Sequence, residues 1–229
     1  MRSPPHRQKQ TMKNTIIKHL ILFMAMMVGI ACYADVMPYY VKDVPGNTMG
    51  LYQTDKVINV YAKPDAKSAV ICKKTINYAD YTNTQSDKFF AVMIPAKELA
   101  FAYVTDVADD ESWVQIIYDK NRNLKGWVKK DDDFQFLPWG TFFDMYARKY
   151  GLYRLRDNSG KTVADGVYSQ PDKSGQELGK VQNPKFIKFM ALEGSWILIS
   201  ELDYMGDTTT GYVEWYTDNG DVLYFPDIK

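Results

Sequence analysis

The residues best suited to chemistry near neutral pH are concentrated at the start of the chain. Both histidines, His6 and His19, precede residue 35, and so does Cys32, one of the two cysteines. Histidine is the usual general base and the commonest transition-metal ligand. Loss of residues 1–34 would therefore exclude Ser-His-Asp and Cys-His catalysis and most zinc sites.

The second cysteine, Cys72, would then be alone, and an intrachain disulfide would be impossible. It ends the apolar run Ala69-Val70-Ile71-Cys72, which is typical of a strand. A thiol becomes reactive beside basic groups or a helix N-terminus. We therefore expect Cys72 to be a buried and inert thiol.

Carboxylates are the remaining candidates for catalysis, and they form two clusters. One comprises Asp106, Asp109, Asp110 and Glu111, and the other Asp131, Asp132 and Asp133. Neither has the alternating spacing of a calcium loop, so solvated loops are the favoured interpretation and weak calcium binding a lesser one. Ser159-Gly160-Lys161-Thr162 imitates a phosphate-binding loop, but Leu155 replaces the required first glycine, which favours a turn.

The first 34 residues have the organisation of a signal peptide. Five basic residues and no acidic ones occur there, and an apolar stretch runs from Leu20 to Ala31, too short to span a bilayer. In Cys32-Tyr33-Ala34, small residues occupy the −3 and −1 positions of a cleavage site before Asp35. Residues 1–11 are interpreted as an upstream extension with Met12 as the start. A membrane anchor and a lipoprotein lipidated at Cys32 are the alternatives.

Charge argues against nucleic acid as a partner. The whole chain has 28 basic and 28 acidic residues, so removing the five basic residues of the leader leaves 23 against 28, a net charge of −5. No basic surplus remains to neutralise phosphates. After residue 34 no apolar run approaches membrane-spanning length, so we expect an exported chain, periplasmic or at the cell surface, without a membrane span.

A repeat organises the rest of the chain, because four short motifs recur in the same order. The first copies are Gly50-Leu51-Tyr52-Gln53, Val60-Tyr61-Ala62-Lys63-Pro64-Asp65, Ser112-Trp113-Val114-Gln115-Ile116 and Gly126-Trp127-Val128-Lys129. The second copies are Gly151-Leu152-Tyr153-Arg154, Val167-Tyr168-Ser169-Gln170-Pro171-Asp172, Ser195-Trp196-Ile197-Leu198-Ile199 and Gly211-Tyr212-Val213-Glu214. Shared order indicates duplicated structural units, with additional residues in the first copy between Lys73 and Val104.

Both units are predicted to be β-structure. The tryptophan-led motifs are rich in β-branched and aromatic residues, and Asp218-Asn219-Gly220-Asp221 is a strong hairpin signal between Tyr212–Tyr216 and Val222–Phe225. Between the units, residues 141–150 predict a helix: Thr141 and Asp144 suggest a capping box, and Gly151 follows as a stop. We expect this helix to be a packed linker.

The repeat resembles the bacterial SH3-like (SH3b) domains. The similarity rests on Val57-Ile58-Asn59-Val60-Tyr61-Ala62-Lys63-Pro64 and on Ser112–Ile116 followed by Lys125-Gly126-Trp127-Val128. In the second copy Gly211-Tyr212-Val213 replaces Gly-Trp-Val. The resemblance implies an all-β fold of two small SH3-like barrels in tandem joined by a short linker helix. It also implies a binding role toward cell-wall peptides or exported proteins.

These observations divide the chain into a signal peptide (1–34), a barrel (35–137) with an insertion near 74–103, a linker helix (138–150) and a second barrel (151–229). Trp113, Trp127 and Trp196 are predicted to pack in or beside the cores. The ligand-binding candidates are aromatic: Tyr61, Trp139, Tyr153, Tyr168 and Trp215, expected to line a groove near the junction. We expect no catalytic residues, no metal and no cofactor.

The leading hypothesis is a non-enzymatic binding module for a peptide of the cell wall or an envelope protein partner. The first alternative is an envelope polysaccharide hydrolase that uses acids such as Asp109 or Glu111, one of which would have to be held protonated. The second alternative is a structural lipoprotein subunit held by Cys32.

Overall fold

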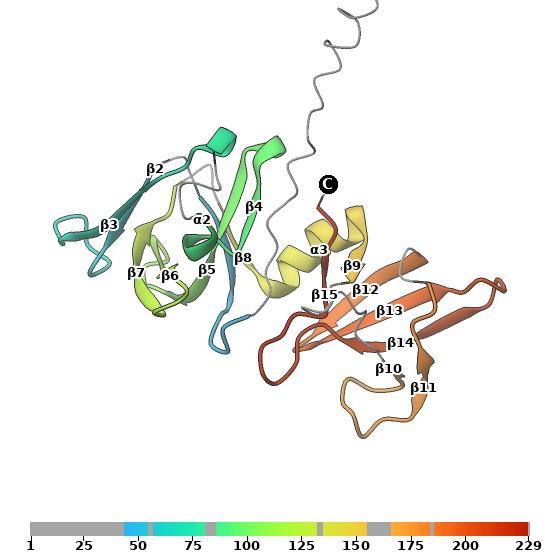
Figure 1. Cartoon of the computed structure of the whole chain (residues 1–229). Helices are drawn as coiled ribbons and strands as arrows, with labels where there is room; N and C mark the ends of the chain where they lie inside the picture. Colours follow the sequence, from blue (N-terminus) through green and yellow to red (C-terminus); the bar gives the residue numbers. More distant parts are fainter. Residues whose placement is uncertain are drawn as a thin grey trace, which may run out of the picture. The chain divides into compact units, whose positions relative to one another are not determined.

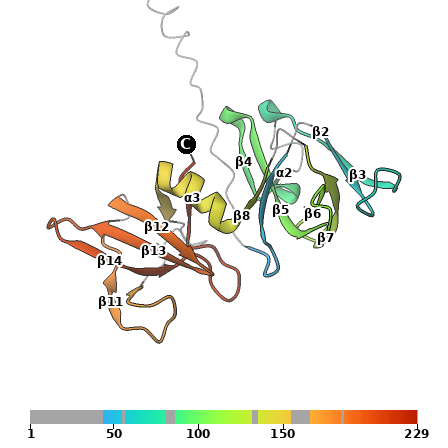
Figure 2. The same ribbon diagram turned by 180° about the vertical axis from the view of Figure 1, so that it is seen from behind.

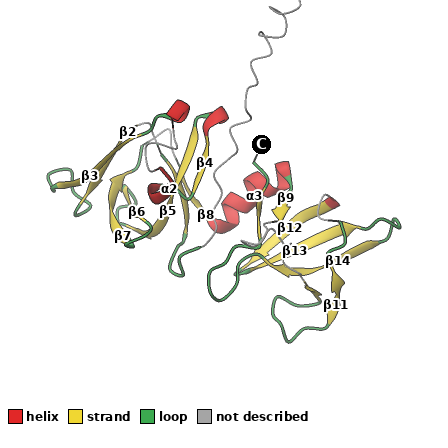
Figure 3. Cartoon of the chain, viewed as in Figure 1, coloured by secondary structure: helices red, strands yellow, loops and turns green. Residues whose placement is uncertain are grey.

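The structure is a computed structural model, and it describes residues 44–54, 57–80, 86–131, 135–154, 166–183 and 186–228. The predicted signal peptide, the cleavage site and Cys32 lie outside these residues. Strand is the predominant regular structure of the described chain (Figure 3). None of its helices combines the length and the apolar character that crossing a bilayer requires.

The first copy forms an eight-stranded antiparallel sheet (Figure 1). Seven strands follow the order β3-β2-β7-β6-β5-β1-β8, and β4 pairs with β5 off this path. Their bounds are β1 Gly50–Gln53, β2 Val57–Tyr61, β3 Val70–Thr75, β4 Val92–Ile94, β5 Leu99–Val107, β6 Trp113–Asp119, β7 Leu124–Lys129 and β8 Phe136–Pro138.

The second copy forms a five-stranded sheet in the order β11-β10-β14-β13-β12, and a separate pair of β15 with β9. The bounds are β9 Leu152–Arg154, β10 Gly166–Tyr168, β11 Glu177–Lys180, β12 Ile187–Glu193, β13 Trp196–Leu202, β14 Thr208–Glu214 and β15 Tyr224–Pro226. The structure is mostly β, which is consistent with the all-β prediction. Among the described strands, however, the pairings close neither sheet into a barrel.

The same five-strand order occurs in both copies. In the first copy β3-β2-β7-β6-β5 are neighbours, and β11-β10-β14-β13-β12 are their counterparts in the second. The irregularities also correspond: the register shifts at Val60/Tyr61 in β2 and at Val167/Tyr168 in β10. β-Bulges are specific features of a fold rather than random defects. The shared strand order and the register shifts at corresponding positions therefore support a duplication.

A glycine sits at the same tight crossing in each copy. A Cβ atom on Gly126 would lie 2.4 Å from Cγ1 of Val60, and one on Gly211 would lie 2.6 Å from Cγ1 of Val167. Both positions also approach the backbone oxygen of the tyrosine that follows the valine. Only glycine lets the strands approach this closely, which explains the glycine in both Gly-aromatic-Val motifs.

The predicted core tryptophans occupy corresponding places. Trp113 begins β6 and Trp196 begins β13, and both are buried. Tyr61 packs edge-on against Trp113 with ring centroids 5.3 Å apart, and Tyr168 packs against Trp196 at 5.5 Å. The two side-chain pairs belong to two separate sheets, as the duplication predicts.

The predicted insertion in the first copy packs against the fold instead of extending into solvent. It contains the 3-10 helices η1 Tyr78–Asp80 and η2 Pro95–Lys97, the short helix α2 Ser86–Phe89, and β4. Residues 89–94, which include two phenylalanines, are all buried. The insertion therefore adds to both buried clusters of the fold: Phe89, Phe90 and Met93 join the one formed within the first copy, whereas Ala91, Val92 and Ile94 join the one that also includes residues of the second copy.

The predicted linker helix is α3, Trp139–Tyr150. It begins two residues earlier than expected, with Pro138 at the N-cap and no side-chain cap, so the capping box between Thr141 and Asp144 was wrong. Asp144 instead pairs with Arg148 at 2.6 Å. The C-terminal stop at Gly151 is confirmed: its φ is +85°, and its N–H donates to the carbonyl of Ala147.

The predicted hairpin turn at residues 218–221 also forms, with Gly220 at a φ of +87° and its N–H donating to the carbonyl of Thr217. The chain after it follows an unexpected course. Tyr216 and Val222 form only an isolated bridge, and the next strand, β15, pairs with β9 instead of β14.

Candidate functional site

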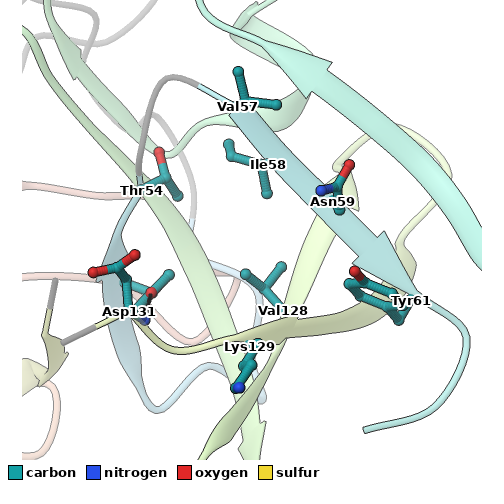
Figure 4. A pocket seen from close by; sticks show the side chains of 9 residues that line it. Thr54, Val57, Ile58, Asn59, Tyr61, Val128, Lys129 and Asp131 are labelled. Carbon is teal, nitrogen blue, oxygen red and sulfur yellow. Dashed lines mark hydrogen bonds between the residues drawn. The ribbon is translucent and has the colours of Figure 1, made fainter. Parts of the chain in front are cut away.

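A cavity of about 150 Å³ opens in the first copy between β2 and the end of β7 (Figure 4). Residues of β2 form one side, and Val128, Lys129 and Asp131 lie opposite them. The lining consists of Tyr52, Thr54, Val57, Ile58, Asn59, Tyr61, Val128, Lys129 and Asp131.

The pocket exists because β2 diverges from β7. β2 pairs with β3 along its whole length, from Val57 to Tyr61, but with β7 only at Tyr61, opposite Trp127. The segment from Val57 to Val60 therefore has a strand neighbour on one side only, among the strands described. Figure 1 and Figure 2 both show the β2–β3 ribbon at the edge of this sheet.

The floor of the pocket is apolar and buried. Ile58 and Val128 are buried side chains of the first-copy core. Tyr52 is buried as well, and its hydroxyl accepts a hydrogen bond of 2.9 Å from the backbone N–H of Asp131. This bond links the segment after β7 to β1 at that end of the pocket.

The rim carries four different kinds of polar group. Asn59 contributes an amide, Lys129 an ammonium group, Asp131 a carboxylate and Tyr61 a phenol. The side chains of Asn59, Lys129 and Asp131 are exposed, and Tyr61 is half-buried against Trp113. The edge-on contact restrains the Tyr61 ring, which then loses little conformational freedom when it meets a ligand.

The second copy has the corresponding framework. β10 pairs with β14 only at Tyr168, opposite Tyr212, just as β2 pairs with β7 only at Tyr61. Tyr168 is half-buried against Trp196. Residues 155–165, which lead into β10, lie outside the described residues, and so does the segment Ser159-Gly160-Lys161-Thr162.

Two of the predicted ligand-binding residues meet, but in the core. Trp139 and Trp215 have ring centroids 5.1 Å apart, and Trp215 is 1 % exposed. The indole N–H of Trp215 donates to the carbonyl of Gly194 at 2.9 Å, so its polar atom is also satisfied internally. Trp215 is therefore a packing residue and not part of an open groove, contrary to the expectation.

The other candidates are dispersed over the fold. Tyr61 lines the β2–β7 pocket, whereas Tyr168 lies in the second sheet. Tyr153 is 40 % exposed in β9, opposite Phe225 of β15. Trp139 is half-buried, and its indole N–H donates to the carbonyl of Thr48 at 3.1 Å. The expected gathering of all five residues at the junction does not occur.

Three carboxylates of the first cluster lie in the turn between β5 and β6, and the fourth, Asp106, lies near the end of β5. Asp109, Asp110 and Glu111 are exposed there. Ser112 donates to Asp110 through both its hydroxyl and its backbone N–H, and these bonds lower the pKa of that carboxyl. This is a solvated turn.

In the second cluster, Asp132 and Asp133 lie outside the described residues. Among those described, no group of three or more metal-ligating side chains could hold an ion.

Cys72 lies in β3 and is half-buried, less enclosed than expected. Burial raises the pKa of its thiol, while the nearby Lys74 opposes this effect. A raised pKa disfavours the thiolate, which is the nucleophilic form.

Sequence reasoning missed most of the pocket. Asn59 and Lys129 were not selected, and Asp131 was considered only as a carboxylate of the second cluster, although Val57-Ile58-Asn59-Val60-Tyr61 alternates between exposed and buried positions in β2. That alternation places Val57, Asn59 and Tyr61 on one face of the strand, and it was the available signal. The facing group, around Lys129, comes from a strand nearly 70 residues later in the chain.

No protein-family model and no curated protein match this chain. Among solved structures, one likeness is to a chain described as a novel NlpC/P60 endopeptidase from Photobacterium damselae subsp. piscicida. The sequence identity is 13 %, and the match covers 81 % of this chain and 35 % of that chain with a TM-score of 0.21. This chain therefore spans about a third of that protein's length, and a likeness this distant carries no argument about activity.

Proposed function

We propose that this protein is an exported, non-enzymatic binding module made of two SH3-like units, and that it recognises a peptide of the cell wall or of an envelope protein. The observation that carries the proposal is the pocket between β2 and β7. An apolar floor with an amide, an ammonium group, a carboxylate and a restrained phenol around it suits a short peptide.

The geometry of β2 supports an extended ligand. A peptide that binds beside a sheet edge gains main-chain hydrogen bonds from the strand and specificity from pockets for its side chains. Between Val57 and Val60, one side of β2 has no neighbouring strand among those described, and the cavity lies on that side.

Binding to purified cell-wall sacculi, and to the envelope proteome in parallel, tests the proposal. Truncating a central aromatic contact typically costs about 2 kcal/mol or more, roughly thirtyfold in affinity. Tyr61→Ala should therefore weaken capture by one of these two materials roughly thirtyfold. Tyr168→Ala is the matched control, because Tyr168 makes the same edge-on contact with a tryptophan in the second copy.

Two results would overturn this function. Equal capture by the wild type and by Tyr61→Ala would remove the pocket from binding. Turnover of a wall polymer that Asp109→Asn abolishes would show a hydrolase instead of a binding module.

Export is part of the proposal and has its own test. Intact-mass analysis of the exported protein should give a chain beginning at Asp35, because cleavage after Ala34 satisfies the small-residue requirement. A chain that begins at Cys32 and is heavier by a diacylglyceryl group would establish the lipoprotein instead.

A further inference from the structure

Two lysines approach a single tyrosine ring at the C-terminal end of α3. The ammonium nitrogen of Lys97 lies 4.9 Å from the centroid of the Tyr150 ring, and that of Lys149 lies 5.0 Å from the same centroid. Tyr146 stacks on the same Tyr150 ring, with the two ring centroids 6.5 Å apart and an interplanar angle of 18°.

Separate elements build this cluster. Lys149 and Tyr150 end α3, whereas Lys97 is the last residue of η2 in the insertion of the first copy. The insertion has no counterpart of similar length between β11 and β12. The cluster therefore has no counterpart in the second copy and does not belong to the repeated framework.

The positive charges of the cluster are not neutralised internally. Within the described part of the chain, neither Lys97 nor Lys149 forms an ion pair with a carboxylate. The neighbouring Arg148 differs, because it pairs with Asp144 at 2.6 Å and donates to the carbonyl of Met190 at 3.2 Å. The cluster consequently holds two ammonium groups that have no carboxylate partner among the described residues, beside one phenol.

The local electrostatics favour an anion. A hydrogen bond from Lys149, together with the charges of Lys149 and Lys97, lowers the pKa of the Tyr150 hydroxyl. The phenol thus senses a positive potential. The C-terminus of a helix carries about half a negative charge, so two ammonium groups outweigh it. The repulsion between the two lysines would be relieved by a bound anion.

We propose that Lys97, Lys149 and Tyr150 form an anion-binding site for a carboxylate or phosphate group. The ammonium groups contact the anion, and the Tyr150 hydroxyl donates a hydrogen bond to it. The site is distinct from the β2–β7 pocket, with which it shares no residue.

The test observes Tyr150 directly. The full chain is labelled with ¹³C at Cζ of tyrosine, and the Tyr150 resonance is assigned from its loss in Tyr150→Phe. Inorganic phosphate and acetate are titrated separately at constant ionic strength, with chloride as the compensating anion. We expect a saturable shift of the Tyr150 resonance with one or both probes, and a weaker apparent affinity, by fivefold or more, in Lys97→Gln and in Lys149→Gln.

Lys67→Gln is the matched control, because it removes an exposed lysine from the β2–β3 turn. It should bind the probes as the wild type does, and far-UV circular dichroism should show that all variants are folded. A response to phosphate alone assigns a phosphate ligand, and a response to acetate assigns a carboxylate. A shift that does not saturate, or that persists in both lysine variants, would overturn the site.

Discussion

Trp139 and Trp215 lie with their ring centroids 5.1 Å apart and their planes inclined by 58°, although 76 residues separate them in sequence. Trp215 also packs against Phe143 of α3 at 4.8 Å. Aromatic packing therefore joins the second copy to the linker helix. These residues contribute to the stability of the fold rather than to a binding surface.

This arrangement predicts that Trp215→Ala lowers the free energy of unfolding by about 3–5 kcal/mol, because it leaves a cavity among packed rings. Urea denaturation measures the change. Tyr204→Ala is the control, because Tyr204 is 76 % exposed and its loss should change stability by less than about 0.5 kcal/mol. A Trp215→Ala protein as stable as the control would contradict the packing described.

The two crossing glycines should respond alike. Gly126→Ala and Gly211→Ala each place a methyl group within 2.6 Å of a valine side chain, so both should destabilise the protein, by about 1–3 kcal/mol each. Gly140→Ala in α3 meets no atom within 4 Å and should stabilise the helix by about 0.5–1 kcal/mol. Thermal melts of the three variants measure these effects, and opposite signs for Gly126→Ala and Gly211→Ala would refute the structural equivalence.

Asp119 should contribute to acid sensitivity. The side chain of Arg122 donates to its carboxylate at 2.7 Å, and this bond holds the pKa of Asp119 below its ordinary value. The contribution to stability is then complete above the unfolded-state pKa of about 3.9 and is lost as pH falls through the folded-state value. The difference in melting temperature between the wild type and Asp119→Asn should be largest near pH 6 and shrink below about pH 4. Asp109→Asn, which removes an exposed carboxylate, is the control, and a difference that grows on acidification would contradict the assignment.

Glu201 should stabilise the segment that precedes β12. Its side chain is buried at 3 % exposure, and it accepts hydrogen bonds from the backbone N–H groups of Gln182, at 2.6 Å, and of Asn183. Glu201→Ala leaves two donors without their acceptor and should cost about 2–3 kcal/mol or more in denaturant unfolding. Glu193→Ala removes only an exposed contact with Tyr212 and should cost less than about 1 kcal/mol. Equal costs in the two variants would contradict this role.

The sequence repeat predicted those features of the fold that depend on local sequence patterns. Strands that begin at Trp113 and Trp196, tight glycine crossings and a helix ending before Gly151 all follow from residues close together in sequence. The burial of Trp215 could not be predicted in this way, because it depends on α3 arriving from far away in the chain. Lys129 and Asn59 form one site for the same reason: their strands meet only after the sheet has formed.

The core extends across both copies. One cluster of buried side chains includes Val92 and Tyr103 of the first copy, Phe142 of α3, and Ile197 and Tyr224 of the second copy. During synthesis the first copy leaves the ribosome while much of that cluster is still untranslated. Its apolar face would remain exposed until the last strand, β15, emerges, so the two halves should complete their folding together, and the nascent chain needs protection from aggregation until then.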